Sequence, residues 1–331
     1  MYSARSVLVC MAAALALAAA ASRTAAQAPA RPADRVTLAL QWLTQCQFAG
    51  YYVALEKGYY RDEGIDLTIL PGAADSNPIQ LVSIGTAQFG TRWFADLAVA
   101  IDKGAPMLSI AQIFGSSGLV LVARADSGIR QPRDFAGRSV GVWFFGNEVQ
   151  FYALMSQAGV DPARVRVSPL QSSLKPLLSR QLDVVSAMTY NELPALLRGG
   201  LKREQLRVFD FNDYGLDFPG DALFASRALL KDRPELARRM VRASLRGWRD
   251  ALQDPDAAVN TVLKHDRTRR LEAGHQREQM REVSRLVRLR GRKLGEHSAE
   301  DSVRTVAILA KGGLMSRARA NDELFTNALL P

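Results

Sequence analysis

Cysteine and histidine are scarce in this sequence, and both shortages limit its chemistry. Of the two cysteines, Cys10 lies in an apolar stretch near the start, so Cys46 is the one cysteine in the rest of the chain. A single cysteine forms no intrachain disulfide, and the stability must come from the hydrophobic core. The histidines at 265, 275 and 297 lack metal-ligand spacing, and we expect them at the surface with no metal site.

Several signatures of catalysis are missing too. The sequence has no Ser-His-Asp order typical of hydrolases, no P-loop and no G-x-G-x-x-G fingerprint. The segment G-S-S-G-L over 115–119 could cradle a phosphate through backbone amides. It equally suits a hinge, which is the interpretation we favour, and we expect no cofactor.

The formal net charge is +10, but basic and aromatic residues do not cluster into a nucleic-acid groove. Much of the arginine lies between Arg227 and Arg304 on helical patterns. We expect a solvated basic face there and no nucleic-acid partner.

Long apolar runs are absent except at the beginning. Residues 7–21 form such a run, which is shorter than the roughly 20 residues of a membrane span. Arg5 precedes it, and small residues at Thr24-Ala25-Ala26 precede Gln27. We predict a signal peptide over 1–26, cleaved near Ala26/Gln27, and an exported mature chain. An uncleaved anchor is the alternative.

The rest of the chain alternates short apolar strands with helices, which is typical of α/β units built on parallel strands. The predicted strands span 36–43, 65–70, 88–90, 107–114, 119–124, 139–144, 165–169, 183–189, 206–210 and 221–225. The predicted helices span 48–57, 79–84, 94–102, 132–135, 148–159, 174–180, 193–197, 234–252, 255–264, 275–291, 299–311 and 320–329.

The alternation restarts after residue 125, which indicates two halves. We predict that the chain crosses between them near 115–125 and again near 210–222. Domain 1 would then comprise 36–118 plus 217–331, and domain 2 would comprise 119–216. Two such domains enclose a cleft that closes like a hinge.

Two strand ends carry the same side-chain pattern. W-F-F-G-N-E (143–148) follows one predicted strand, and Y-N-E (190–192) follows another. Ligands of parallel sheets bind beyond the carboxyl ends of the strands. Both ends are therefore candidates for the wall of a ligand site.

Five stretches of the sequence together resemble a known family. They are L-Q-W-L-T-Q-C-Q-F-A-G-Y-Y-V-A-L-E-K-G-Y-Y (40–60), E-G-I-D-L-T-I-L-P-G (63–72), N-P-I-Q-L-V-S-I-G-T-A-Q-F-G (77–90), G-V-W-F-F-G-N-E (141–148) and A-M-T-Y-N-E-L (187–193). They are similar to periplasmic solute-binding proteins for thiamine pyrimidine precursors, a group related to alkanesulfonate and taurine binders. The resemblance covers roughly 36–330 and is weaker in the Arg-rich tail.

This resemblance implies an α/β type II periplasmic binding fold with two domains, two crossover segments and a helical C-terminal tail. It also implies a monomer in the periplasm, an ABC permease and ATPase as membrane partners, and no catalysis. Some relatives are eukaryotic enzymes that make the thiamine pyrimidine, and they carry a C-C-C-F-C segment. This sequence has no such segment, so we expect a binding protein rather than an enzyme.

A flat aminopyrimidine needs aromatic contacts on its faces and paired donors and acceptors at its polar edge. Carboxylates accept from its amine, and an asparagine amide both donates and accepts. The predicted ligand-binding residues are Trp42, Tyr51, Trp93, Trp143, Gly146, Asn147, Glu148, Tyr190, Asn191, Glu192 and Asp221.

Structural roles compete with binding at some of these positions. Tyr51 can pack in the core, as can Phe144, whereas Glu148 suits a helix start through the dipole alone. Asp221 can belong to a hinge, and Cys46 can be a small wall residue.

Alternative ligands keep the fold. Another flat heterocycle such as riboflavin is one, and a small sulfonate is another. A sulfonate needs a cationic or amide-rich pocket, and Arg92 is the candidate cation. A pyrimidine-synthesising enzyme and a sensor input domain are the alternatives from other classes.

Overall fold

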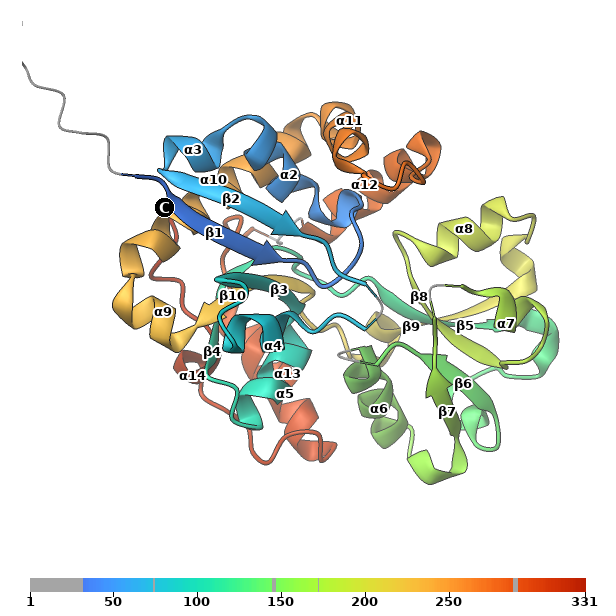
Figure 1. Cartoon of the computed structure of the whole chain (residues 1–331). Coiled ribbons are helices and arrows are strands. Elements are labelled where there is room, and N and C mark those ends of the chain that lie inside the picture. Colours follow the sequence, from blue (N-terminus) through green and yellow to red (C-terminus); the bar gives the residue numbers. More distant parts are fainter. Residues whose placement is uncertain (1–31, 74, 145–146, 172, 288–290) are drawn as a thin grey trace, which may run out of the picture. The chain divides into compact units, whose positions relative to one another are not determined.

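The computed structural model describes residues 32–73, 75–144, 147–171, 173–287 and 291–331. Ten strands in this part of the chain form two five-stranded sheets (Figure 1). The first sheet has the order β2 (Ile65–Leu70), β1 (Asp34–Ala39), β3 (Phe89–Trp93), β10 (Asp221–Ser226) and β4 (Met107–Gln112). The second has the order β7 (Arg166–Pro169), β6 (Ser139–Val142), β8 (Val184–Met188), β5 (Leu119–Arg124) and β9 (Leu206–Asp210). All ten predicted strands are therefore present.

Both sheets are mixed rather than wholly parallel. β1 pairs in parallel with β2 and β3, and β6 pairs in parallel with β7 and β8. β10 is antiparallel to β3 and β4, and β5 is antiparallel to β8 and β9. Each of these two strands comes directly after the chain has crossed from the other sheet, so it enters from the opposite end. The two predicted crossovers are thus present, whereas the exact domain boundaries stay a prediction.

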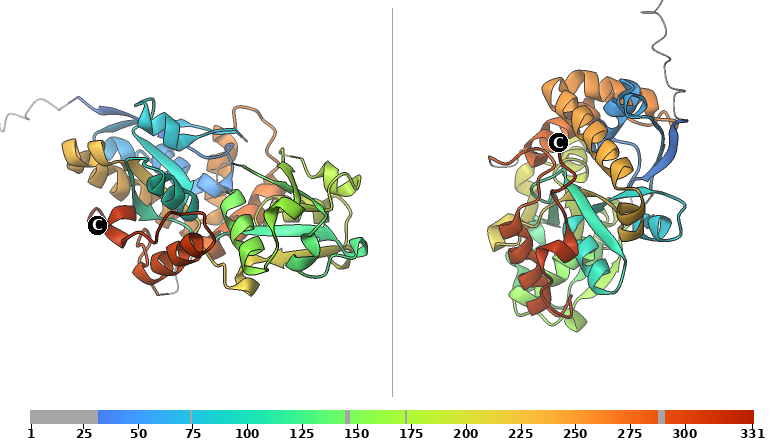
Figure 2. Two further views of the ribbon diagram at one scale, coloured as in Figure 1. Left: turned by 90° about the horizontal axis from the view of Figure 1, so that it is seen from below. Right: turned by 90° about the vertical axis from the view of Figure 1, so that its left-hand side faces the viewer.

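Helices from distant parts of the sequence cover the first sheet. α2 (Ala49–Glu56), α3 (Tyr59–Asp62), α10 (Pro234–Gln253), α11 (Pro255–His265) and α12 (Ala273–Val287) lie on one side. α4 (Pro78–Ser83), α5 (Phe94–Asp102) and α13 (Ala299–Lys311) lie on the other, and α9 (Arg227–Asp232) follows β10. Figure 2 shows the orange α10 beside the blue α2. The two helices approach closely because Gly247 has no side chain. A Cβ at this position would collide with the backbone of Gly50.

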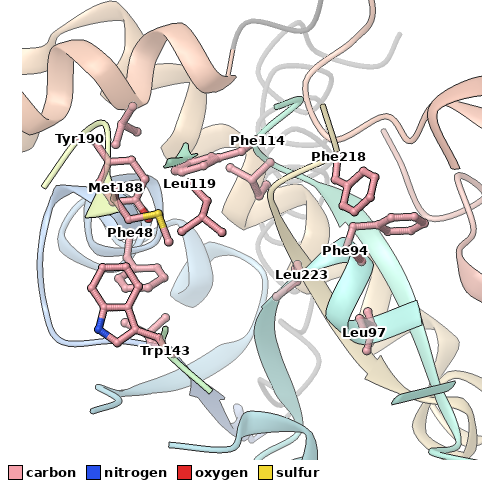
Figure 3. Close-up of a cluster of buried hydrophobic side chains, with 14 of the residues drawn as sticks. Phe48, Phe94, Leu97, Phe114, Leu119, Trp143, Met188, Tyr190, Phe218 and Leu223 are labelled. Atoms are coloured by element: carbon pink, nitrogen blue, oxygen red, sulfur yellow. The ribbon is translucent and has the colours of Figure 1, made fainter. Parts of the chain in front are cut away.

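The second sheet carries α6 (Asn147–Gln157), α7 (Lys175–Leu178) and α8 (Glu192–Arg198). One buried apolar cluster includes residues of both sheets. In Figure 3, Phe48, the last residue of a short 3-10 helix after β1, lies beside Met188 at the end of β8 and beside Trp143 and Tyr190, which follow β6 and β8. The two sheets therefore meet through side chains as well as through the crossovers.

The end of the chain differs from its prediction. The expected helix 320–329 is wrong beyond α14 (Asn321–Leu324), because Phe325 is extended and forms a bridge with Ser109 of β4. His297 is buried rather than at the surface: its Nε2 lies 2.7 Å from Ser109 Oγ, and its ring stacks on Phe325. Burial lowers the pKa of His297 to about 4.

Arginines at the start of α10 and along it form ion pairs with acidic residues near the N-terminal ends of β1 and β2. Arg233 and Arg239 both pair with Asp34 at 2.6 Å, and Arg242 pairs with Glu63 at 2.6 Å. These side chains tie α10 to the sheet. None of the described helices is long and apolar enough to cross a membrane. The predicted signal peptide lies outside the described residues.

Candidate ligand-binding site

A narrow cavity lies where elements of the two sheets meet. Ten side chains line it: Trp42, Gln45, Gln47, Trp93, Trp143, Asn147, Met188, Tyr190, Asn191 and Glu192. Trp42 comes shortly after β1, Trp93 ends β3, Trp143 follows β6, and Met188 ends β8. The cavity therefore lies at the carboxyl ends of parallel strands, the position where α/β sheets bind ligands.

The first-sheet wall consists of Trp42, Gln45, Gln47 and Trp93. Strand β1 stops at Ala39, earlier than predicted, so that Trp42 and Gln45 lie in the following loop. Gln47 lies in a short 3-10 helix, Cys46–Phe48. The polar members are connected, since Gln45 Nε2 donates to Gln47 Oε1 at 2.7 Å.

A buried carboxylate anchors this wall from behind. Asp221 Oδ2 accepts from Gln47 Nε2 at 2.8 Å, and its Oδ1 accepts from Gln41 Nε2 at 2.9 Å. Burial raises the pKa of Asp221 to about 7, although both glutamines and the charge of Arg92 oppose the shift. Asp221 itself does not line the cavity, but it orients Gln47, which does.

The second-sheet wall consists of Trp143, Asn147, Met188, Tyr190, Asn191 and Glu192. Trp143 Nε1 donates to the carbonyl of Gln171 at 3.2 Å, which fixes the indole. Its ring meets Trp42 edge to face, with centroids 6.1 Å apart. The indoles of the two walls are thus in contact.

Glu192 is the buried carboxylate of this second wall. Its Oε2 accepts from the backbone N–H of Met188 at 2.9 Å, and its Oε1 accepts from Asn191 Nδ2 at 2.6 Å. Burial raises the pKa of Glu192 to about 7, against the lowering effect of these hydrogen bonds. The group is therefore able to accept or donate a proton near neutral pH.

Helix α12 connects the two walls. Gln279 Nε2 donates to Gln45 Oε1 at 3.1 Å and to Asn191 Oδ1 at 3.3 Å. His275 Nε2 lies 2.7 Å from the same Asn191 oxygen and must donate, because an amide oxygen only accepts. His275 Nδ1 then accepts from Arg198, and burial followed by the Arg198 charge lowers the pKa of His275. This histidine is partly buried, contrary to the expectation of a surface position.

The amide orientations follow from these contacts. The carbonyl oxygens of Asn191 and Gln45 are occupied by Gln279 and His275. Their amino groups donate to Glu192 and Gln47, and each amino group has a second hydrogen. Asn191 and Glu192 thus offer a donor and an acceptor side by side.

Seven of the predicted residues line the cavity: Trp42, Trp93, Trp143, Asn147, Tyr190, Asn191 and Glu192. Three are placed elsewhere. Tyr51 is buried against Trp248 with ring centroids 5.7 Å apart, Asp221 lies behind the glutamines, and Glu148 in the first turn of α6 is not among the lining residues. Gly146 lies outside the described residues. Cys46 does not line the cavity, and burial raises the pKa of its thiol well above the usual range.

Sequence reasoning missed Gln45, Gln47 and Met188. The available signal was the position of Gln45 and Gln47, two polar residues directly after an apolar strand on either side of a cysteine. Met188 ends a buried strand and resembles any core residue.

Comparisons with known proteins agree with this architecture. The chain is 29% identical to a riboflavin-binding protein, RibY, of Chloroflexus aurantiacus, over 94% of this chain and 91% of that one. It is 26% identical to a formylaminopyrimidine-binding protein of Halalkalibacterium halodurans, over 70% of each chain. It is also 27% identical to a 4-amino-5-hydroxymethyl-2-methylpyrimidine phosphate synthase of Legionella pneumophila, over 70% of this chain and 73% of that one.

Among solved structures, the periplasmic aliphatic sulphonate binding protein SsuA from Escherichia coli matches with a TM-score of 0.67 at 13% identity. The match covers 88% of this chain and 91% of that one, and it confirms the periplasmic binding protein fold. A family model described as NMT1/THI5 like matches residues 45–258. The chain therefore belongs to the NMT1/THI5-like family.

Proposed function

We propose that this protein is the periplasmic solute-binding component of an ABC importer and that it binds a thiamine pyrimidine precursor in the cavity between the two sheets. The observation that carries the proposal is the adjacent donor and acceptor of Asn191 and Glu192, set among tryptophans from both walls. We take the ligand to be of the formylaminopyrimidine or hydroxymethylpyrimidine type.

The polar edge of an aminopyrimidine matches this pair. Its exocyclic amine donates to the Glu192 carboxyl, and a ring nitrogen next to that amine accepts from the free hydrogen of Asn191 Nδ2. The raised pKa of Glu192 means that part of this carboxyl is protonated at neutral pH, and the amine favours its ionised, accepting form. Hydrogen bonds of this charge-assisted kind are stronger than neutral ones.

The faces of the ring match the indoles. Trp42, Trp93 and Trp143 present aromatic surfaces from both sheets, and each aromatic contact is worth about 0.5–1.5 kcal/mol beyond area burial. Since Trp42 and Trp143 touch in this state, ligand entry requires the sheets to separate about the two crossovers. An importer permease and ATPase would then distinguish the closed, loaded form.

The residues that line the cavity support the alternative functions less well. The described part of the cavity wall includes no lysine or arginine, which disfavours a sulfonate. It includes no histidine or cysteine either, so it offers a pyrimidine synthase no imidazole, thiol or amine. A riboflavin-like heterocycle is the second candidate, because the riboflavin-binding relative matches over nearly the whole chain.

Isothermal titration calorimetry of the exported protein tests the proposal directly. The titrants are formylaminopyrimidine, hydroxymethylpyrimidine, riboflavin and a short alkanesulfonate. We expect saturable heat with a pyrimidine and none with the sulfonate. Heat with riboflavin alone would transfer the assignment to the second candidate, and heat with the sulfonate alone would overturn it.

A further inference from the structure

A second cavity adjoins the first behind the tryptophans. The two cavities share Trp42, Trp93, Trp143 and Asn147 as lining residues. The second one adds polar groups of a different kind, from Gln41, Ser76 and Arg92. A ligand ring in the first cavity would therefore have this compartment at its edge, beyond the indoles.

Gln41 has an unmet hydrogen-bonding group. Its side chain is 2% exposed, and its Nε2 donates to Asp221. Its Oε1 has no hydrogen-bond partner among the described residues. A buried acceptor without a donor costs free energy, so the site favours a ligand that supplies one.

Arg92 contributes donors without contributing much net charge. The residue is 3% exposed, its Nε donates to Asp96, and its guanidinium carbon lies 5.5 Å from the centroid of the Trp93 ring. The Asp96 carboxylate balances the guanidinium directly. Neither Asp96 nor Asp221 lines the compartment. The ion pair with Asp96 leaves the guanidinium little net charge with which to balance a phosphate or sulfonate.

We infer that this compartment, defined by Gln41, Ser76 and Arg92, binds a neutral arm of the ligand that carries a hydroxyl or an amide. The arm donates to Gln41 Oε1 and accepts from the remaining N–H groups of Arg92. The inference rests on the proposed function, because the ring must occupy the first cavity. It predicts that the protein selects uncharged precursors against their phosphate esters.

Three ligands test this on the unaltered protein by calorimetry. They share an aminopyrimidine ring and differ in one substituent, which is hydroxymethyl, methyl or the phosphate ester of the hydroxymethyl group. We expect the alcohol to bind about 5–50-fold more tightly than the methyl compound, as one buried hydrogen bond requires. We expect the phosphate to bind at least about 10-fold more weakly than the alcohol, because buried charges without a net counter-charge are disfavoured.

The variant Gln41→Met assigns the effect to this compartment. It should reduce the alcohol-to-methyl ratio to about 2-fold or less, because the arm loses its acceptor. The change also removes the donor to Asp221 Oδ1, and the ratio cancels any loss of affinity that this causes for both ligands alike. Melting curves establish that the variant folds. Equal binding of alcohol and methyl compound by the unaltered protein, or tightest binding of the phosphate, would refute the neutral arm. Absence of binding by all three would instead refute the proposed function.

Discussion

The two walls of the cavity are built alike but supported differently. Each has a buried carboxylate, Asp221 in the first and Glu192 in the second, and burial raises both pKa values to about 7. Asp221 does not line the cavity and acts through its hydrogen bond to Gln47, whereas Glu192 lines the cavity itself. The first carboxylate thus positions a lining residue, and the second is a lining residue itself.

The origin of the support also differs. In the first wall, Gln47 is held by Asp221 of the same sheet, and Gln45 is held through Gln47. The oxygen of Asn191 in the second wall is held by Gln279 and His275 on α12, a helix that packs on the first sheet's α11 and on the 3-10 helix beside the cavity. The orientation of Asn191 in the second wall therefore depends on a helix that also contacts Gln45 of the first.

The largest expected effect concerns the stability role of Asp221. Its folded pKa lies above its unfolded value, so the folded state holds more protons between about pH 4 and 7 and loses stability as pH rises through this range. The loss from this group between pH 5 and 8 is about 2–3 kcal/mol. Asp221→Asn should remove that part of the pH dependence in urea unfolding curves at several pH values.

The matched control is Asp256→Asn, because Asp256 is exposed and its side chain is 82% accessible. It should leave the pH profile of stability unchanged. A larger fall in stability with rising pH for Asp221→Asn than for the unaltered protein would show that Asp221 is ionised at low pH in the folded state. Its raised pKa would then be wrong, whereas its hydrogen bonds to the two glutamines would stand.

Glu192→Gln should weaken pyrimidine binding about 10- to 100-fold, because it replaces a charge-assisted acceptor with a neutral amide. Calorimetry measures the affinity, and melting temperatures check the fold. The control is Glu148→Gln, which changes the other predicted glutamate. Glu148 is not among the lining residues, so the affinity of this variant for the pyrimidine should stay within about 2-fold of the unaltered protein's. Equal losses in both variants would remove the distinction between the lining carboxylate and its neighbour.

The difference between the walls also explains what the sequence could predict. Trp143, Asn191 and Glu192 were found because a strand-to-helix junction is visible locally, and the same pattern occurs twice. All ten strands were likewise local apolar patterns. The hydrogen bond between Gln45 and Gln279 could not be predicted from the sequence, because 234 residues separate them and the packing of α12 brings them together.

Two other differences have the same cause. Tyr51 looked like a stacking residue, but α10 returns from far along the chain and covers it with Trp248. The last helix was predicted from its composition, but Phe325 binds in the extended conformation at Ser109 of β4. Tertiary contacts overrode local propensity in both places.

Gln279→Leu tests the coupling between the walls and should weaken binding about 3- to 10-fold, as loss of one orienting hydrogen-bond donor implies. The loss of affinity should be moderate for two reasons. His275 still donates to the Asn191 oxygen, and Gln279 Oε1 has no hydrogen-bond partner among the described residues that the substitution would leave unpaired. The exposed neighbour on the same helix gives the control Arg277→Ala. Unchanged affinity in Gln279→Leu would mean that each wall is oriented independently.

The smallest effect is expected at Tyr51, the predicted site residue that the structure places in the core. Its hydroxyl is buried without a hydrogen-bond partner among the described residues, and its ring packs edge to face on Trp248. Tyr51→Phe keeps the ring and removes the unpaired hydroxyl, so affinity should change less than about 2-fold and the melting temperature should stay equal or rise. A clear loss of pyrimidine binding with an unchanged melting temperature would mean that the hydroxyl reaches the ligand when the walls are apart. The first wall would then extend deeper into α2 than the lining residues indicate.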